Sequence, residues 1–345
     1  MVYLCRRRLR LYYKMQKHFP EKAVHGGRII ALRQKYGPDL LDVSASMNPF
    51  LPLISCDFQE IDLCVYPDDT YSALKDKIGH VFSRPTDEIC VGNGSAELIR
   101  VYCNVLLSPN DTVRIDPPTF GEYGLSAKLA GANVVSGMDA DLRIICNPNN
   151  PTGILRSRDE MLALLDDCTK KNSRLFVDEA FMELAARNES ISDIRSDDLF
   201  VMRSITKCFS VPGIRFGFGF GPADLIEKIE TVRTPWTVNA FAEAFTMRAL
   251  DHYDDLVLSA EKISAEREWY FARLTELDLS FEPSSVNYIL VHLGRNASEF
   301  TESMLEHGVL VRDCTSFGLL ESIRISVETR EKNLRVVEAL SACLR

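Results

Sequence analysis

Lys207 is the residue of this sequence whose neighbours are best suited to covalent chemistry. It ends the tetrapeptide Ser204-Ile205-Thr206-Lys207, which follows an apolar run, and Arg215 lies eight positions further on. A lysine amine can form a Schiff base with a phosphorylated aldehyde, while hydroxyl and guanidinium groups hold the phosphate. A lysine that closes a strand can also be a solvated surface residue, so the assignment needs support from other segments.

Three earlier segments offer the remaining groups that such a site requires. Residues 147–153 form a stiff turn of asparagines, prolines and a glycine after an apolar run, where open α/β sheets place their ligands. Residues 174–181 form an apolar strand that ends at Asp178 and Glu179, and an acid there can pair with a protonated ring nitrogen or cap the next helix. Residues 91–98 run through a glycine turn into a helix, whose first N–H groups can bind phosphate.

The elements that position these segments alternate between strands and helices. Between residues 88 and 220, short apolar runs alternate with helical patterns and turns, which is typical of a mostly parallel sheet covered by helices on both faces. The strands expected there are 112–115, 142–146, 175–177 and 199–202, and the expected helices are 96–106, 158–169 and 225–231.

A second, smaller α+β domain is expected in the C-terminal part of the chain. An amphipathic stretch over 240–274 leads into it, followed by strands at 288–292 and 323–327 and helices at 297–307 and 331–344. The chain is therefore expected to consist of an N-terminal arm (1–48), a large domain (49–236) and a small domain (237–345).

In their order and spacing, the four segments resemble the fold-type I pyridoxal-phosphate enzymes of the aminotransferase superfamily, from about residue 24 to residue 344. The resemblance implies an α/β aminotransferase fold, pyridoxal 5'-phosphate as cofactor, a homodimer, and Lys207 as the lysine that binds the cofactor covalently. It also implies Asp178 at the pyridine nitrogen, Asn150 at the ring hydroxyl and Phe120 stacked on the ring. Around the cofactor phosphate it implies Gly94, Ser95, Ser204, Thr206 and Arg215, with Tyr66 reaching the phosphate of a neighbouring subunit.

Two groups within the superfamily fit this length, the histidinol-phosphate aminotransferases and the threonine-phosphate decarboxylases of cobalamin biosynthesis. The segment Val24-His25-Gly26-Gly27 and the later Ser44-Ala45-Ser46-Met47-Asn48-Pro49 resemble the decarboxylase opening, whereas the aminotransferases usually carry Asn-Glu-Asn-Pro there. Phe181 stands in the cofactor site where the aminotransferases usually have a tyrosine that bonds the ring oxygen. Arg28 departs from the decarboxylase pattern, which often has asparagine at that position.

The decarboxylase resemblance implies a small phosphorylated amino acid as substrate. It implies conversion of L-threonine O-3-phosphate to (R)-1-amino-2-propanol O-2-phosphate and CO2, with a transaminase acting on histidinol phosphate or another amino acid as the alternative. Arg324 resembles the carboxylate clamp of the superfamily, and Arg312 is expected to face the substrate too, although either could form a surface ion pair. His25 and Asn48 are expected at the substrate phosphate; an arm that does not touch substrate is the alternative for His25.

Composition argues against several other classes of protein. A chain of 345 residues with 46% hydrophobic content can bury the core of two domains, and its net charge of −9 argues against a general nucleic-acid binder. The ten cysteines form no C-x-x-C pair, which favours reduced thiols in a cytoplasmic protein. The histidines show no metal-ligand spacing, so no metal site is expected. No run approaches the ~18 apolar residues of a membrane span.

Other patterns in the sequence point elsewhere only weakly. Ser204-x-x-Lys207 matches the nucleophile motif of penicillin-binding proteins and β-lactamases, but the sequence has no Lys-Thr-Gly. The alternating glycines of residues 217–221 do not make G-x-G-x-x-G, so they indicate close packing in a strand rather than a dinucleotide site.

The basic first 22 residues are too interrupted for a secretory signal, and Met15 could be the natural start. A membrane-surface or nucleic-acid arm is the alternative for this segment, but it lacks the two-helix pattern of a DNA reader.

Overall fold

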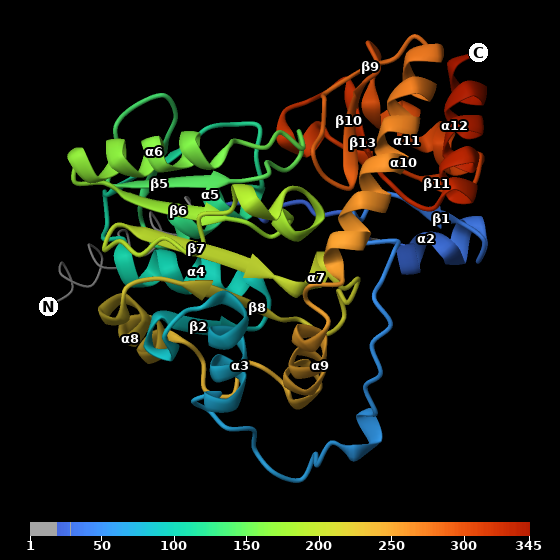
Figure 1. Ribbon diagram of the computed structural model, residues 1–345. Helices are drawn as coiled ribbons and strands as arrows, with labels where there is room; N and C mark the ends of the chain where they lie inside the picture. The colour runs from blue at the N-terminus through green and yellow to red at the C-terminus, as the bar shows by residue number, and fades with distance from the viewer. Residues whose placement is uncertain (1–18, 28) are drawn as a thin grey trace, which may run out of the picture.

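The computed structural model describes residues 19–27 and 29–345, so the basic N-terminal run, Met15 and Arg28 lie outside the described residues. Figure 1 shows a large domain and, at the upper right of the view, a small domain that the long helix α10 (Leu256–Glu276) joins to it. The expected α/β fold is confirmed, with a mostly parallel sheet covered by helices in the large domain and a smaller C-terminal α+β domain.

The large domain is built on a seven-stranded sheet with the order β2-β8-β7-β6-β5-β3-β4. Its β8 runs antiparallel to both of its neighbours, whereas the pairs from β7 to β4 are parallel. The parallel strands end at one edge of the sheet, where such folds place their ligands. The strands are β2 (Ile89–Gly92), β3 (Thr112–Ile115), β4 (Asn133–Val135), β5 (Leu142–Cys146), β6 (Arg174–Asp178), β7 (Leu199–Ser204) and β8 (Gly217–Phe220).

Helices cover both faces of this sheet because alternate residues of each strand point to opposite sides. On β6, Leu175 and Val177 pack in the cluster with α6, while Phe176 packs in the cluster with α4. The alternating glycines of β8 have the role expected of them, since a Cβ at Gly219 would overlap the ring of Phe200. The helices of this domain are α3 (Ser72–Phe82), α4 (Ser95–Leu106), α5 (Gly121–Leu129), α6 (Arg158–Lys170), α7 (Ile205–Cys208), α8 (Ala223–Val232) and α9 (Ala240–Asp251).

The amphipathic stretch over 240–274 is divided between the two domains. Helix α9 packs against α3 of the large domain, and α10 carries the chain on to the small domain. The expected boundary before residue 237 therefore precedes a helix that still belongs with the large domain. A turn at residues 252–255 separates the two helices. Within this turn, the His252 imidazole contacts the Asp255 carboxylate at 2.9 Å.

The small domain holds a four-stranded antiparallel sheet in the order β12-β13-β10-β9. Part of the N-terminal arm joins it, because β1 pairs with β11 in parallel, and α2 packs on the cluster of Leu40, Leu305 and Leu310. The elements are α2 (Ile29–Tyr36), β1 (Leu41–Asp42), β9 (Ser280–Phe281), β10 (Tyr288–His292), α11 (Ala297–Glu306), β11 (Val309–Leu310), β12 (Arg312–Asp313), β13 (Ser322–Ser326) and α12 (Arg330–Leu344).

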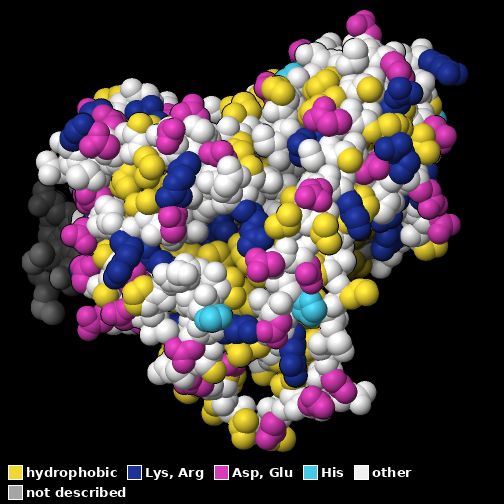
Figure 2. Space-filling model, in the orientation of Figure 1, with side chains coloured by type: hydrophobic (Ala, Val, Ile, Leu, Met, Phe, Trp, Pro, Cys, Tyr) yellow, Lys and Arg dark blue, Asp and Glu magenta, His cyan; other side chains and the backbone are white. Residues whose placement is uncertain are grey.

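Between β1 and α3, the chain from residue 51 to residue 70 runs over the surface, interrupted by a short 3-10 turn at Phe58–Glu60. Its large apolar side chains are exposed, among them Leu53 (95%), Leu63, Val65 and Tyr66. Figure 2 shows apolar side chains along the lower edge of the molecule, where Figure 1 places this segment. An exposed apolar strip of this kind is typical of an interaction surface.

The cysteines in the described part of the chain are all free thiols, and most of them are buried. Within residues 19–27 and 29–345, no helix combines the length and the apolar character that crossing a bilayer requires.

Candidate active site

A cavity of about 960 Å³ lies at the edge of the large sheet where the parallel strands end. Its walls come from the arm, from the starts of α4 and α5, from the α7 turn and from the small domain. Ten of the residues singled out in the sequence line it: His25, Ser95, Phe120, Asn150, Ser204, Thr206, Lys207, Arg215, Arg312 and Arg324. The fold therefore gathers groups that lie as much as 299 positions apart in the chain.

Lys207 lies in the short helix α7, directly after β7. The hydroxyl of Ser204 accepts a hydrogen bond from the Thr206 N–H at 3.3 Å and so caps this turn. Burial, and then the positive charges of Arg324 and Arg215, lower the pKa of the Lys207 amine to about 8, although Asp178 acts in the opposite direction. The uncharged form of this amine, which is the nucleophilic form, is therefore much more populated near neutral pH than in an ordinary lysine, although the protonated form still predominates.

Asp178 ends β6 with its side chain buried. The Tyr123 hydroxyl donates to Oδ2 at 2.6 Å and the Ala180 N–H donates to Oδ1 at 2.9 Å. Burial raises the pKa of this carboxyl to about 6 even though both hydrogen bonds favour its charged form. A cation beside it, such as a protonated ring nitrogen, would stabilise the carboxylate. Tyr123 was not singled out in the sequence, although it lies three positions after Phe120 in the first turn of α5.

A group of hydrogen-bond donors meets where α4 begins. A Cβ on Gly94, whose φ is +77°, would overlap the Arg215 guanidinium, and a Cβ on Gly217 would lie 2.7 Å from the Ser95 nitrogen. Glycine at these two positions lets the arginine and the helix start come close together. The helix N–H groups, the hydroxyls of Ser204 and Thr206 and the Arg215 guanidinium together suit a phosphate dianion.

Two arginines of the small domain face the same cavity. Arg312 and Arg324 are directly opposite one another in the β12–β13 pair. Arg324 donates to the Asn150 side-chain oxygen at 2.5 Å and to the Ser44 carbonyl at 3.0 Å, and its guanidinium lies 4.8 Å from the ring centroid of Tyr288. This arginine is thus held in one orientation beside Asn150, next to the lysine.

The arm reaches the cavity through residues 20–27, which we call the strap. His25 Nε2 lies 2.7 Å from the Glu122 carboxylate, and the His25 ring lies 5.7 Å from the ring of Phe120. Arg312 donates to the Val24 carbonyl at 2.9 Å. Sequence reasoning did not single out Glu122, because nothing local links it to a histidine 97 positions earlier.

Five of the expected site residues do not line the cavity themselves: Gly94, Asp178, Phe181, Asn48 and Tyr66. The Phe181 ring centroid lies 5.8 Å from the Lys207 amine, so it packs beside the lysine. Asn48 was expected at the substrate phosphate, but its buried amide donates to the Cys208 carbonyl at 2.8 Å and accepts from the Phe50 N–H, which places it behind the α7 turn. Tyr66 is 78% exposed and stacks on Trp236 at 4.5 Å, on the surface segment.

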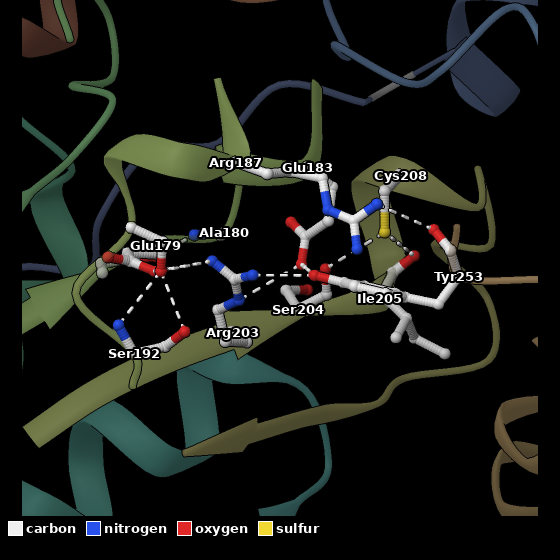
Figure 3. A network of polar contacts seen from close by, with 12 residues as sticks. Glu179, Ala180, Glu183, Arg187, Ser192, Arg203, Ser204, Ile205, Cys208 and Tyr253 are labelled. Carbon is white, nitrogen blue, oxygen red and sulfur yellow. Dashed lines mark hydrogen bonds and ion pairs between the residues drawn. The ribbon is translucent and has the colours of Figure 1, made fainter. Parts of the chain in front are cut away.

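A buried ionic network lies one residue away from the cavity groups on both strands. Figure 3 shows Arg203 of β7 between Glu179 and Tyr253, with Nη1 donating to Glu179 at 2.6 Å and Nη2 to the Tyr253 oxygen at 2.8 Å. Glu183 contacts the Arg203 Nε at 3.3 Å. Burial opposes the charge of the guanidinium, but the surrounding acidic groups raise its pKa above the ordinary value. This network fixes the ends of β6 and β7 relative to one another.

Known proteins of one family are similar to this chain in sequence and in structure. The family model for aminotransferase class I and II matches residues 62–340. A histidinol-phosphate aminotransferase of Symbiobacterium thermophilum is 31% identical, over 89% of this chain and 91% of the relative. A protein of Caldanaerobacter subterraneus described as a "Putative threonine-phosphate decarboxylase" is 35% identical, over 92% of each. The crystal structure of the histidinol-phosphate aminotransferase from Clostridium acetobutylicum, 27% identical, matches 88% of this chain and 99% of its own with a TM-score of 0.80.

Proposed function

The chain belongs to the aminotransferase class I and II family, and from that premise we propose that it decarboxylates L-threonine O-3-phosphate to (R)-1-amino-2-propanol O-2-phosphate and CO2. The cofactor of this family is pyridoxal 5'-phosphate. When bound, it withdraws electrons from the α-carbon of an attached amino acid and so weakens the bonds there.

The residues in and beside the cavity suit this cofactor. Ser95, Arg215 and the α7 hydroxyls provide the donors for its phosphate, and the amine of Lys207 lies in the same cavity. Asp178, whose pKa is about 6, would be stabilised as a carboxylate by a protonated pyridine nitrogen. Phe120, on the cavity wall, has the flat apolar face against which an aromatic ring can stack.

The observation that carries the choice of substrate is a second set of basic side chains in the cavity. Arg312, Arg324 and His25 line it in addition to the donors at the start of α4. Threonine phosphate brings a carboxylate and a phosphate into the site on one small skeleton, whereas in the alternative reaction the phosphate of histidinol phosphate and the carboxylates of 2-oxoglutarate arrive on separate molecules. Two opposed arginines and an imidazole match the larger negative charge of threonine phosphate.

Arg324 would orient the bond that breaks. Its contacts with Asn150 and the Ser44 carbonyl fix the guanidinium, so a carboxylate paired with it is held in one place. Loss of CO2 requires that carboxylate to stand out of the plane of the cofactor ring. Phe181 beside the lysine supports the same choice, because it offers no hydroxyl to the ring oxygen.

A histidinol-phosphate aminotransferase is the second candidate, and the 31% identical relative with that name favours it. Both candidates share the cofactor and Lys207. They differ in which bond at the α-carbon breaks, so the reaction products separate them.

We further propose a cytoplasmic homodimer. The exposed apolar side chains of the surface segment support a second copy as partner, with Tyr66 reaching the cofactor phosphate of that copy. The free thiols of the described residues support a reducing compartment.

The proposal is tested by supplying the holoenzyme with each substrate in turn. Threonine phosphate alone should yield CO2 and aminopropanol phosphate in stoichiometric amounts, and Lys207→Ala should yield neither. Histidinol phosphate with 2-oxoglutarate should yield no glutamate above the rate of the variant. Glutamate production without CO2 would replace the decarboxylase with the aminotransferase.

A further inference from the structure

The strap, residues 20–27, forms an outer wall of the cavity and is tied to both domains. Most of its residues are exposed, yet they also line the cavity. On the side of the small domain, Arg312 donates to the Val24 carbonyl at 2.9 Å. On the side of the large domain, His25 contacts Glu122 at 2.7 Å. Gly26 fits closely between them, since a Cβ there would lie 3.2 Å from the Ser44 carbonyl oxygen.

Glu122 is the fixed point of the contact with the large domain. Its side chain, in the first turn of α5, is only 5% exposed, and its second oxygen lies 3.1 Å from Arg100. A buried carboxylate cannot turn away from two such partners without leaving a charge unpaired. The position of the His25 ring is therefore set by Glu122, and the neighbouring ring of Phe120 limits its tilt.

We propose that Glu122 is a positioning residue that docks the strap over a phosphorylated amino-acid substrate by holding Nε2 of His25. The other ring nitrogen, Nδ1, is then the one that can meet the substrate phosphate. An imidazolium donates from both nitrogens, so one N–H can serve the Glu122 carboxylate and the other the phosphate dianion. This inference rests on the proposed function for the identity of the substrate, threonine phosphate, while the contact itself requires only a substrate phosphate.

A double-mutant cycle between His25→Ala and Glu122→Gln tests the coupling through the KM of threonine phosphate. His25→Ala should raise this KM by about tenfold to a hundredfold, the range for a lost hydrogen bond to a charged group, and change kcat much less. Glu122→Gln should raise the KM in the wild-type background but no further in the His25→Ala background. Equal effects of Glu122→Gln in both backgrounds, or no effect in either, would overturn the proposal.

A matched control comes from a second histidine–glutamate pair outside the cavity. Glu282 lies 3.3 Å from His292 on the small-domain sheet, and Glu282→Gln should leave the KM unchanged. The ring nitrogen signals of His25, assigned with His25→Ala by 15N NMR without substrate, should move in Glu122→Gln and stay in Glu282→Gln. Unmoved His25 signals in Glu122→Gln would also overturn the proposal. If Glu122→Gln does not fold, Glu122→Asp shortens the reach of the carboxylate and serves the same cycle.

The two hypotheses fail in different measurements. Lack of CO2 from the wild-type enzyme contradicts the proposed function before any variant is compared. In that case the double-mutant cycle is measured with the KM of histidinol phosphate, which also carries a phosphate. The same coupling between His25 and Glu122 is expected for this substrate.

Discussion

The ends of β6 and β7 carry charged groups on two sides, and the two sides are used in opposite ways. On the side of the cavity, Asp178 and Lys207 have shifted pKa values and lack a full set of ionic partners. Glu179 directly follows Asp178, and Arg203 lies four positions before Lys207. These two residues form a buried ion pair at 2.6 Å, and Glu179 also accepts from the Ser190 hydroxyl. Charged groups that are paired within the protein hold the strands in place. Charged groups that lack such a partner remain available to a ligand.

This comparison explains why the same backbone can be rigid and reactive. Replacing a partner in the buried network leaves a charge unpaired in the interior, so folding is affected. Replacing a cavity group removes an interaction that is completed only by cofactor or substrate, so chemistry is affected. Mutations on the two sides should therefore separate an effect on stability from an effect on turnover.

The largest effect is expected at Lys207. Lys207→Ala should lower turnover by at least about 10³-fold, because it removes the covalent catalyst, while the unfolding midpoint without cofactor stays close to that of the wild type. Steady-state kinetics and denaturant unfolding measure the two quantities. A variant that kept more than a few per cent of the activity would remove Lys207 from its role.

Arg203 should show the opposite pattern. Arg203→Met leaves Glu179 and Glu183 buried without their cation, so the free energy of unfolding should fall by about 3–5 kcal/mol. Urea unfolding of the variant and the wild type checks this value. A variant as stable as the wild type would mean that the network contributes nothing to holding the strands.

Asp178 is the counterpart of Glu179 on the side of the cavity. Asp178→Asn should still bind the cofactor but lose about a hundredfold to a thousandfold in kcat, the range for one electrostatic stabiliser, because a neutral amide cannot keep the ring nitrogen protonated. Glu179→Gln is the matched control, and it should lower stability more than kcat per folded molecule. Near-normal turnover of Asp178→Asn would break the contrast between the two sides.

The smallest effect concerns the surface segment rather than the strand ends. If Tyr66 serves the site of a neighbouring subunit, mixing inactive Tyr66→Ala and Lys207→Ala subunits should restore up to about a quarter of the wild-type activity, in mixed dimers with one intact site. Subunit exchange must be demonstrated with differently tagged chains. Exchange without recovery would show that each subunit completes its own site.

The sequence predicts the groups at strand ends well and the contacts between distant segments poorly. Asn150 and Lys207 follow β5 and β7, and Asp178 ends β6; parallel strands must bring such positions to one edge of the sheet. Local spacing is enough to locate them.

Glu122, Tyr123 and the Arg203 network depend on three-dimensional contacts that no local pattern encodes. His25 and Glu122 are 97 positions apart, and Tyr123 and Asp178 are 55 apart. Asn48 illustrates the same limit, because the motif that contains it indicates the site, but only the fold shows that its amide is used by the backbone behind Lys207.

Borohydride reduction of the holoenzyme, followed by peptide mapping, tests the central claim that the α7 lysine anchors the cofactor. The account predicts reduced cofactor on the peptide that contains Lys207, and none on any peptide of Lys207→Ala. Reduced cofactor on a different lysine, or on none, would contradict it.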